Sequence, residues 1–335
     1  MRLASAIVVV VACAAPAPST QPTGDGPIQT GGDGPMMSTI DAADVGSACL
    51  ALATARCTQL MTCSPSDLQR QFGTVPVCLT RETLACTDAL GAADTGATAG
   101  GMIACGSAVA AEACGDFLAG SALAACVALG SNNGTCSFSS QCETGFCGVG
   151  AYALCGTCQA EPVVGTSCAT DGCGQTLVCD NSNHLCEAPA AQGKTCNNAT
   201  PCQHGLICVG ATSGTCQPQV TTLNGACDPT HKTKANCNAD DGLTCDEGND
   251  KCVAQPLVAV GSACGIVNNV DNACTGGATC LIPNGQTKGT CQAPAADGSA
   301  CNINTGPDCF TPARCVPNPP TGSAGTCQLP GTTSC

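Results

Sequence analysis

The sequence contains no tryptophan, one tyrosine and five phenylalanines among its 335 residues. Large aromatic side chains supply much of the buried area of ordinary domains, so their scarcity argues against a single large hydrophobic core. The apolar fraction of 44% includes the chain's 35 cysteines and many alanines. With 41 glycines and 21 prolines, long regular elements are not expected over much of the chain.

Positive charge is also scarce. Ten Lys and Arg stand against 24 Asp and Glu, which gives a formal net charge of −14. Because there is no basic stripe, binding to nucleic acid or to anionic lipid through charge is disfavoured.

Motifs of catalysis are missing as well. The three histidines, His184, His204 and His231, lie far apart in the sequence, and neither His-Glu-x-x-His nor Gly-x-Ser-x-Gly occurs. A histidine acts in catalysis only beside a positioned partner. We therefore predict that the protein is not an enzyme and has no catalytic residues, no cofactor and no metal site.

Cysteine is the abundant residue, at about a tenth of the chain. This density is typical of exported proteins whose folds are held by disulfides in place of a large core. The predicted fold class is disulfide-rich: a small all-α N-terminal domain, followed by an elongated array of small, mostly irregular Cys repeats with short β-hairpins.

The first residues read as an export signal. Arg2 precedes a short apolar run that is too short to span a membrane. Residues 10–13, Val-Val-Ala-Cys, resemble a bacterial lipobox, and this resemblance implies that Cys13 becomes the lipid-modified first residue of the mature chain. The alternative is ordinary signal-peptidase cleavage before Ala15, which gives free secretion. Either way Cys13 leaves the disulfide pool and 34 cysteines remain, an even number.

Residues 14–44 are rich in Pro, Gly, Thr, Ser and Asp and have no hydrophobic period. Such a segment cannot bury enough apolar surface to offset its chain entropy. We predict a flexible tether between the signal, residues 1–13, and the first domain.

Residues 45–130 carry helix signals. Ser47 is expected to cap a first helix with Cys49 and Leu60 on its buried face, and Ser64 to cap a second that ends at Gly73. Further helices are predicted over 80–90, 101–113 and 117–129. Eight cysteines should tie these helices with four bridges: Cys49, Cys57, Cys63, Cys78, Cys86, Cys105, Cys114 and Cys126. Their spacing resembles an eight-cysteine helical region of bacterial Cys-rich lipoproteins, which implies no particular activity.

Residues 131–335 contain six repeats of one unit. The unit is Gly-x-x-Cys followed by three more cysteines; in the first repeat the glycine is shifted to Gly134, and in the fourth Asn224 takes its place. The cysteines, repeat by repeat, are Cys136, Cys142, Cys147, Cys155 and the extra Cys158; Cys168, Cys173, Cys179 and Cys186; Cys196, Cys202, Cys208 and Cys216; Cys227, Cys237, Cys245 and Cys252; Cys264, Cys274, Cys280 and Cys291; and Cys301, Cys309, Cys315 and Cys327, with Cys335 at the end.

Four cysteines allow three pairings, and the sequence does not choose among them. The extras, Cys158 and Cys335, pair with each other only if the array folds back; otherwise the bonding frame is offset. The spacing of the first repeat resembles the Dickkopf N-terminal cysteine-rich region, in which a Cys-x2-Cys closes the unit as it does at residues 155–158. That resemblance implies an architecture and a family that binds proteins.

Three functions remain open. The first is a lipid-anchored or secreted envelope or surface protein with a structural, adhesive or protein-recognition role, located at an outer membrane or cell surface or in the extracellular space. Its partners would be the membrane, through the lipid, and another protein or a surface glycan. The second is a secreted inhibitor or receptor-modulating module. The third is an envelope thiol–disulfide oxidoreductase that uses Cys155 and Cys158.

Overall fold

The computed structural model describes residues 42–335 except 151, 169–172, 175–176, 181–182, 198–199, 211–212, 320–321 and 332–334. The predicted signal, Cys13 and nearly all of the predicted tether lie outside the described residues. The chain divides into two units, Met1–Thr39 and Ile40–Cys335, and the fold described below is that of the second. The predicted domain boundaries stay predictions.

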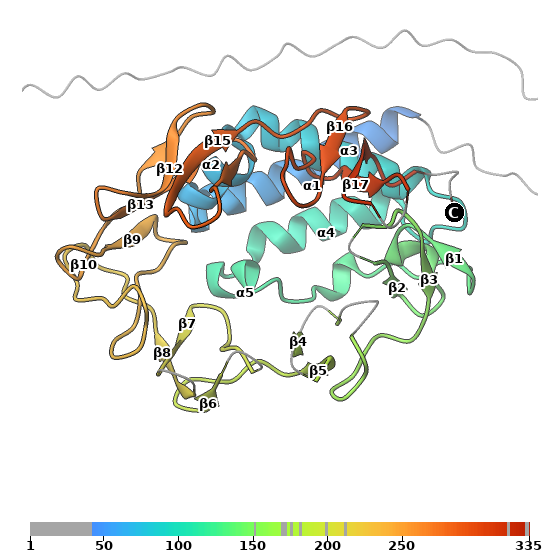
Figure 1. The fold of residues 1–335 in the computed structure, drawn as a ribbon. Helices are drawn as coiled ribbons and strands as arrows, with labels where there is room; N and C mark the ends of the chain where they lie inside the picture. The colour runs from blue at the N-terminus through green and yellow to red at the C-terminus, as the bar shows by residue number, and fades with distance from the viewer. Residues whose placement is uncertain are drawn as a thin grey trace, which may run out of the picture. The chain divides into compact units, whose positions relative to one another are not determined.

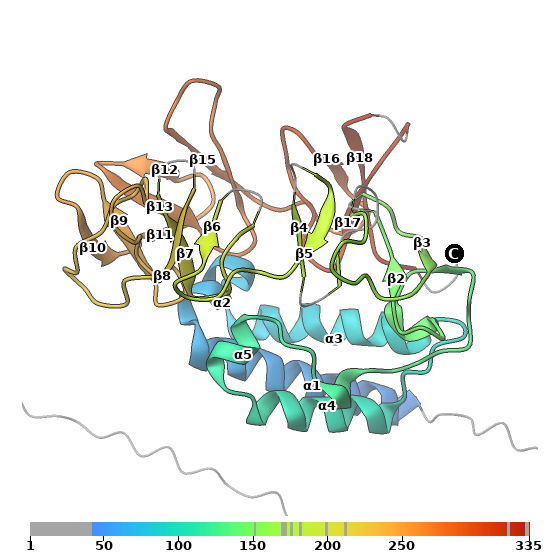
Figure 2. The same cartoon turned by 90° about the horizontal axis from the view of Figure 1, so that it is seen from below.

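The first part of this unit is helical. Its elements are α1 (Ala42–Cys63), α2 (Pro65–Phe72), α3 (Val75–Gly91), α4 (Ala99–Ala111), α5 (Cys114–Leu118) and the 3-10 turn η1 (Ala124–Cys126). Helix α1 packs between α3 and α4 (Figure 2). Its predicted buried face is confirmed, since Cys49 is fully buried and Leu60 is 9% exposed.

The ends of α2 are those the sequence predicts. Ser64 Oγ accepts a hydrogen bond from the Asp67 amide, Pro65 occupies the first turn, and Gly73 ends the helix at φ 76°. These are the residues that favour a helix start and a left-handed stop. The start predicted for the first helix is wrong, because α1 already begins at Ala42 and includes Ser47.

The helix predicted over 117–129 is also wrong. Helix α5 ends at Leu118 because Gly120 adopts φ 66°. The Gly120 amide donates to the Phe117 carbonyl, and the Ser121 amide donates to the Asp116 carbonyl. This pair of bonds is a Schellman-type ending, which turns the chain away from the helix axis.

Disulfides supply much of the core of the helical part. Cys49–Cys86 lies among Leu52 and Val109, and Cys57–Cys78 lies among Leu68 and other apolar side chains. The other two bridges are Cys63–Cys114 and Cys105–Cys126. Half-cystines therefore fill positions that large apolar residues occupy in an ordinary helical bundle.

The repeats form small sheets, which follow one another in Figure 1. Their elements are β1 (Thr135–Cys136), η2 (Ser139–Gln141), β2 (Cys147–Gly148), β3 (Gly156–Cys158), β4 (Val178–Asp180), β5 (Leu185–Glu187), β6 (Thr195–Cys196), β7 (Leu206–Val209), β8 (Gly214–Pro218), β9 (Leu243–Asp246), β10 (Lys251–Ala254), β11 (Leu257–Val258), β12 (Ala263–Val267), β13 (Val270–Cys274), β14 (Thr279–Leu281), β15 (Lys288–Gln292), β16 (Ala300–Asn302), β17 (Arg314–Pro317) and β18 (Ala324–Gln328). The predicted fold class is confirmed.

Each repeat is built on one antiparallel hairpin. In the third repeat Cys208 of β7 lies opposite Cys216 of β8, and the other repeats place the corresponding cysteines opposite each other in the same way. In the first, third, fifth and sixth repeats the strand that carries the first cysteine joins the hairpin on its other side.

The pairing in repeats two to six follows one rule: the first cysteine bonds the third, and the second bonds the fourth. The bridges are Cys168–Cys179, Cys173–Cys186, Cys196–Cys208, Cys202–Cys216, Cys227–Cys245, Cys237–Cys252, Cys264–Cys280, Cys274–Cys291, Cys301–Cys315 and Cys309–Cys327.

The first repeat departs from this rule. Cys136 bonds Cys147 as expected, but Cys142 bonds Cys158, which takes the role of the fourth cysteine. Cys155 bonds Cys335. The predicted alternative in which Cys158 pairs with Cys335 is therefore wrong, and the frame of the first repeat is offset.

The residue that leads each of repeats two to six, a glycine in all but the fourth, has a structural reason. Gly193 adopts φ 77°, and its amide donates a 2.8 Å hydrogen bond to the carbonyl of Cys216, the fourth cysteine. Gly165, Gly261 and Gly298 make the same bond in their repeats. Asn224 makes it at φ 62°, a conformation that Asn tolerates better than most residues.

Candidate functional site

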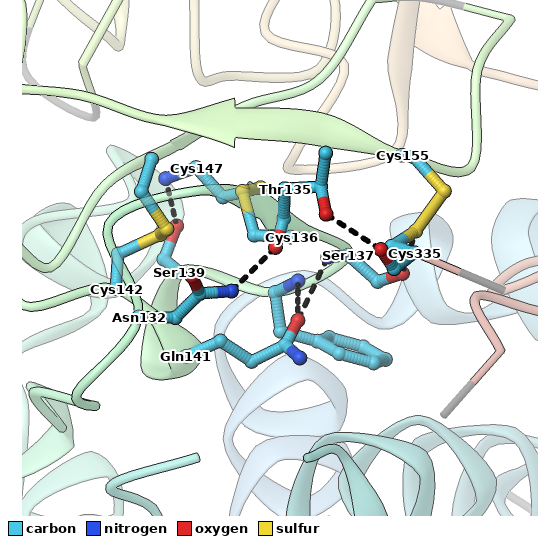
Figure 3. The surroundings of a disulfide bond; sticks show 12 residues. Asn132, Thr135, Cys136, Ser137, Ser139, Gln141, Cys142, Cys147, Cys155 and Cys335 are labelled. Carbon is cyan, nitrogen blue, oxygen red and sulfur yellow. Dashed lines mark hydrogen bonds between the residues drawn. A yellow bond between two sulfur atoms is a disulfide. The ribbon is translucent and has the colours of Figure 1, made fainter. Parts of the chain in front are cut away.

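The bridge between Cys155 and Cys335 joins residues 180 positions apart (Figure 3). Around it, Thr135 Oγ1 donates a hydrogen bond to the Cys335 carbonyl oxygen, and Ser137 Oγ lies 2.8 Å from Cys335 Sγ. Arg314 of the sixth repeat donates to the Ala153 carbonyl at 3.0 Å. The last repeat is thus held against the first, and the array is covalently closed on itself.

The structure separates the two cysteines of the Cys-x2-Cys motif. Cys155 bonds Cys335, whereas Cys158 bonds Cys142. A thiol–disulfide oxidoreductase uses a bridge between the two cysteines of its own motif, and this arrangement lacks that bridge. Cysteines that cluster within the repeats bond one another as disulfides, whereas a zinc ion requires thiolates.

Two repeats dock on α2 through polar contacts. Ser64 Oγ donates to the carbonyl of Asp240, and Ser66 Oγ donates to that of Ala239, both in the fourth repeat. In the fifth repeat the amides of Gly276 and Gly277 donate to carbonyls in the last turn of α2 at 2.9 and 2.7 Å. The Gly277 amide thereby satisfies the Arg70 carbonyl at the end of the helix, and the Gly276 amide adds a second bond to the Gln69 carbonyl, which also accepts the Gly73 amide.

The sixth repeat docks on α3 through Arg81. Its guanidinium makes two hydrogen bonds to Asp297, at 2.7 and 2.9 Å, and also donates to the carbonyls of Phe310 and Thr311. The guanidinium carbon lies 5.0 Å from the centroid of the Phe310 ring. Both the charge and the planar shape of arginine are used here.

The first repeat docks on the loop before α4. Gln141 donates its side-chain amide to the Ala93 carbonyl at 2.8 Å and accepts the amides of Ser137 and Phe138. The Gly96 amide donates to Ser140 at 2.7 Å. Repeats one, four, five and six therefore each have hydrogen bonds to the helical part.

A cleft of about 750 Å³ lies between α5 and repeats two to four, and we call it the acidic cleft. Its charged and ionisable lining is Asp116 of α5, His204 of the third repeat, and Asp240 and Asp241 of the fourth. Apolar side chains complete the walls, among them Leu118, Leu177, Val178 and Pro189. The lining includes no lysine or arginine, so the cleft is suited to a ligand with positive charge.

Within the acidic cleft the carboxylates differ in their partners. Asp240 Oδ2 lies 3.1 Å from His204 Nε2, which ties the third repeat to the fourth. Asp241 accepts a hydrogen bond from Asn238 at 3.1 Å. Neither Asp116 nor Asp241 takes part in an ion pair with a described residue, so both keep their charge available.

A second cleft, of about 540 Å³, lies between α2 and the fifth and sixth repeats. Its charged groups already form hydrogen bonds and an ion pair with neighbouring side chains. Arg70 contacts Asp67 at 2.8 Å and donates to Gln255 at 3.1 Å, and Gln255 in turn donates to Asp271 at 3.2 Å. The polar side chains of this cleft therefore act mainly in holding the repeats on α2.

The three histidines are placed in three repeats. His184 lies in the hairpin turn of the second repeat at φ 57°, and its carbonyl accepts the Cys168 amide. His231 Nδ1 lies 3.0 Å from the Cys208 carbonyl. Of the three, only His204 lines either of the two clefts described above. Sequence reasoning had not singled out Asp116, Asp240 or Asp241, because nothing in their spacing joins α5 to the fourth repeat.

No helix in the part of the chain that the structure describes has the length and apolar character needed to cross a bilayer. Disulfides in this number persist in oxidising surroundings, which places the protein outside the cytosol, at a surface or in the extracellular space.

Comparison with known proteins found one informative similarity. No family model matches the chain, and no solved structure matches it. The chain is similar to the "Cell-cell adhesion glycoprotein 64" of Heterostelium pallidum, with 25% identity over 155 residues. The match covers 45% of this chain and 43% of that glycoprotein, so the chain spans less than half of its relative's length. The chain is thus a disulfide-rich protein of cysteine repeats with partial similarity to an adhesion glycoprotein.

Proposed function

We propose that this is an exported surface protein that acts in adhesion by binding other proteins, and that it does so without catalysis. The similarity to a cell-cell adhesion glycoprotein supports this role. The bridging of Cys155 and Cys158 to different partners removes the main sequence argument for an oxidoreductase.

The observation that carries the proposal is the covalent closure of the repeat array. Adhesion loads a protein by pulling on it, and a chain resists extension where cross-links prevent its segments from separating. Here each repeat from the second to the sixth is stapled by two bridges, and Cys155–Cys335 joins the first repeat to the end of the array. We expect these bridges to limit how far the turns and hairpins can separate when the molecule is under load.

The mode of attachment is a finer part of the proposal. We propose that lipidation of Cys13 anchors the protein and that residues 14–44 act as its tether. The resemblances to bacterial Cys-rich lipoproteins and to Dickkopf modules stay predictions. Replacement of Cys13 by serine should move the protein from the detergent phase to the aqueous phase on phase separation. A wild-type protein that already lies in the aqueous phase, as the variant does, would point to free secretion.

Adhesion is tested with beads that carry the oxidised mature protein. Such beads should aggregate with one another or attach to cells of the producing organism. Beads that carry the same protein after reduction and alkylation should do neither, because the array loses its cross-links. Oxidised beads that neither aggregate nor attach at any coating density would contradict the proposal.

A further inference from the structure

The strongest concentration of positive charge on the described surface is one turn of the fourth repeat, residues 228–235, which we call the basic turn. The whole chain has ten Lys and Arg, and only Lys232 and Lys234 lie within three residues of each other. Both side chains are exposed. Neither forms an ion pair with any described residue.

The basic turn is held rigid by Asp228. Its carboxylate accepts the amides of Thr230, Lys232 and Thr233 at 2.9 to 3.1 Å, and both threonine hydroxyls at 2.7 and 2.9 Å. These hydrogen bonds, that of the Thr230 hydroxyl first, hold the pKa of Asp228 well below its usual range. A turn fixed in this way loses little conformational entropy when it binds.

The turn is also fastened to the neighbouring repeat. The Gly210 amide donates to the His231 carbonyl at 3.0 Å, and His231 Nδ1 lies 3.0 Å from the Cys208 carbonyl. Lys232 and Lys234 therefore project from a backbone that two repeats support.

The acidic cleft is complementary to this turn. Asp116 lines it from α5 and Asp241 from the fourth repeat, and no ion pair among the described residues uses either one. Leu118 and Val178 contribute apolar wall to the same cleft. Opposite charges attract more strongly beside apolar surface than in open water, because the surface excludes solvent that would screen them.

We propose that the acidic cleft of one molecule binds the basic turn of a second copy of this chain. The inference rests on the proposed adhesive function and names its contact. Two molecules of net charge −14 repel each other over most of their surfaces, so a stable contact must bring together the places where opposite charges are concentrated. Because turn and cleft are different surfaces, the contact is head-to-tail and can continue from molecule to molecule.

Charge reversal on each side tests the contact. One variant carries Lys232→Glu and Lys234→Glu, and a second carries Asp116→Lys and Asp241→Lys. Each alone should weaken self-association of the mature protein at least about tenfold in Kd by sedimentation velocity. The matched control is Lys194→Glu with Lys288→Glu, which makes the same change of charge on exposed residues of other repeats. Its self-association should be as strong as that of the wild-type protein.

Mixing separates a lost contact from a damaged fold. An equimolar mixture of the two variants should associate again, because each supplies the surface that the other has lost. A chain that carries all four substitutions should associate with itself, since its turn is now acidic and its cleft basic. If the substitutions had damaged the fold, neither the mixture nor the chain with four substitutions would associate.

Several results would overturn the inference. They are a wild-type protein that stays monomeric over the accessible concentrations, a Lys232→Glu/Lys234→Glu variant that associates as the wild type does, and a mixture that stays dissociated. Loss of self-association in the cleft variant alone would show that the cleft binds a segment of the second copy other than the basic turn, which overturns the assignment of the turn. If beads that carry either variant still adhere normally, adhesion uses another surface, and the proposed function stands without this contact.

Discussion

Gly289 lies directly against Leu281: a Cβ atom on Gly289 would sit 1.9 Å from the Leu281 carbonyl oxygen. Gly289 pairs with Cys264 of the neighbouring strand, and it begins the sequence Gly-Thr-Cys. The same approach occurs at Gly156, Gly214 and Gly325, with distances of 1.9 to 2.2 Å. In all four, the close contact is with the partner strand of the same hairpin, so a side chain at these glycines would force the two hairpin strands apart.

Gly289→Ala should therefore disrupt the fifth repeat. The added methyl group meets backbone that cannot move without breaking the sheet, so the loss of stability should exceed about 2 kcal/mol. Gly298→Ala is the matched control. Its φ of 78° is unfavourable for alanine, but nothing lies within 4 Å of the new Cβ, and roughly 1–2 kcal/mol is expected. Denaturant unfolding compares the two, and equal losses would contradict the steric argument.

Arg81 should be a principal attachment of the sixth repeat to α3. Arg81→Met removes its hydrogen bonds to Asp297 and to the carbonyls of Phe310 and Thr311, and about 1–3 kcal/mol of stability should be lost. Its side chain is only 12% exposed. Arg56→Met is the control. The Arg56 side chain is 53% exposed and forms one ion pair, with Glu82, so its loss should cost little stability.

Thermal unfolding and hydrogen exchange in the sixth repeat measure the effect of these substitutions. Faster exchange confined to residues 297–327 in Arg81→Met would indicate local release of the repeat. Equal melting temperatures for the two variants would show that the Arg81 contacts are not needed for docking.

Asp88 gives the fold a dependence on pH. Burial raises its pKa above the usual value, and the nearby Asp297 adds to this, while Arg81 opposes it. One carboxylate oxygen of Asp88 is buried without a hydrogen-bond partner in the described structure. Since the folded pKa exceeds the unfolded one, ionised Asp88 destabilises the fold at neutral pH, and this penalty disappears as the pH falls below the unfolded value.

Asp88→Asn should raise the melting temperature at pH 7 and leave it nearly unchanged at pH 3. Glu143→Gln is a control that removes one carboxylate at an exposed position of the first repeat. A gain for Asp88→Asn of equal size at both pH values would show that packing, and not ionisation, is responsible.

Cysteine spacing predicted more of this fold than hydrophobic pattern did. The recurring cysteine spacing revealed six repeats, four of which open with Gly-x-x-Cys, and the physical basis of that glycine is the bond from the Gly193 amide to the Cys216 carbonyl and its equivalents. Ser64 and Gly73 gave both ends of α2. Gly120 marked the end of α5 equally clearly, but the alanine-rich run that follows suggested a helix.

Other features depend on contacts that are distant in the sequence. The partner of Cys155 lies 180 positions away, and no local spacing identifies it. Asp116 and Asp241 come together only because the fourth repeat docks beside the helices. By contrast, Gly-Thr-Cys-Gln stands in the sequence four times, beginning at Gly156, Gly214, Gly289 and Gly325, and marks the repeats in which the first cysteine's strand joins the hairpin.

The bridge between Cys155 and Cys335 should stabilise the closed array without shaping its individual repeats. In Cys155→Ser with Cys335→Ser, the other 16 bridges should form as before, since each depends on contacts within a repeat or within the helical part. The loss of stability should be about 2–4 kcal/mol, because the remaining cross-links shorten the loop that the bridge closes. Non-reducing peptide mapping and thermal unfolding measure both expectations.

The matched control is Cys173→Ser with Cys186→Ser, which removes a bridge across only 13 residues of the second repeat. It should loosen that repeat and leave the array closed. Limited proteolysis after partial unfolding distinguishes the two: the Cys155/Cys335 variant should release the sixth repeat first, and the control should be cut within the second repeat. If the sixth repeat stays equally protected in both variants, Arg81 and Arg314 hold it in place without help from the disulfide.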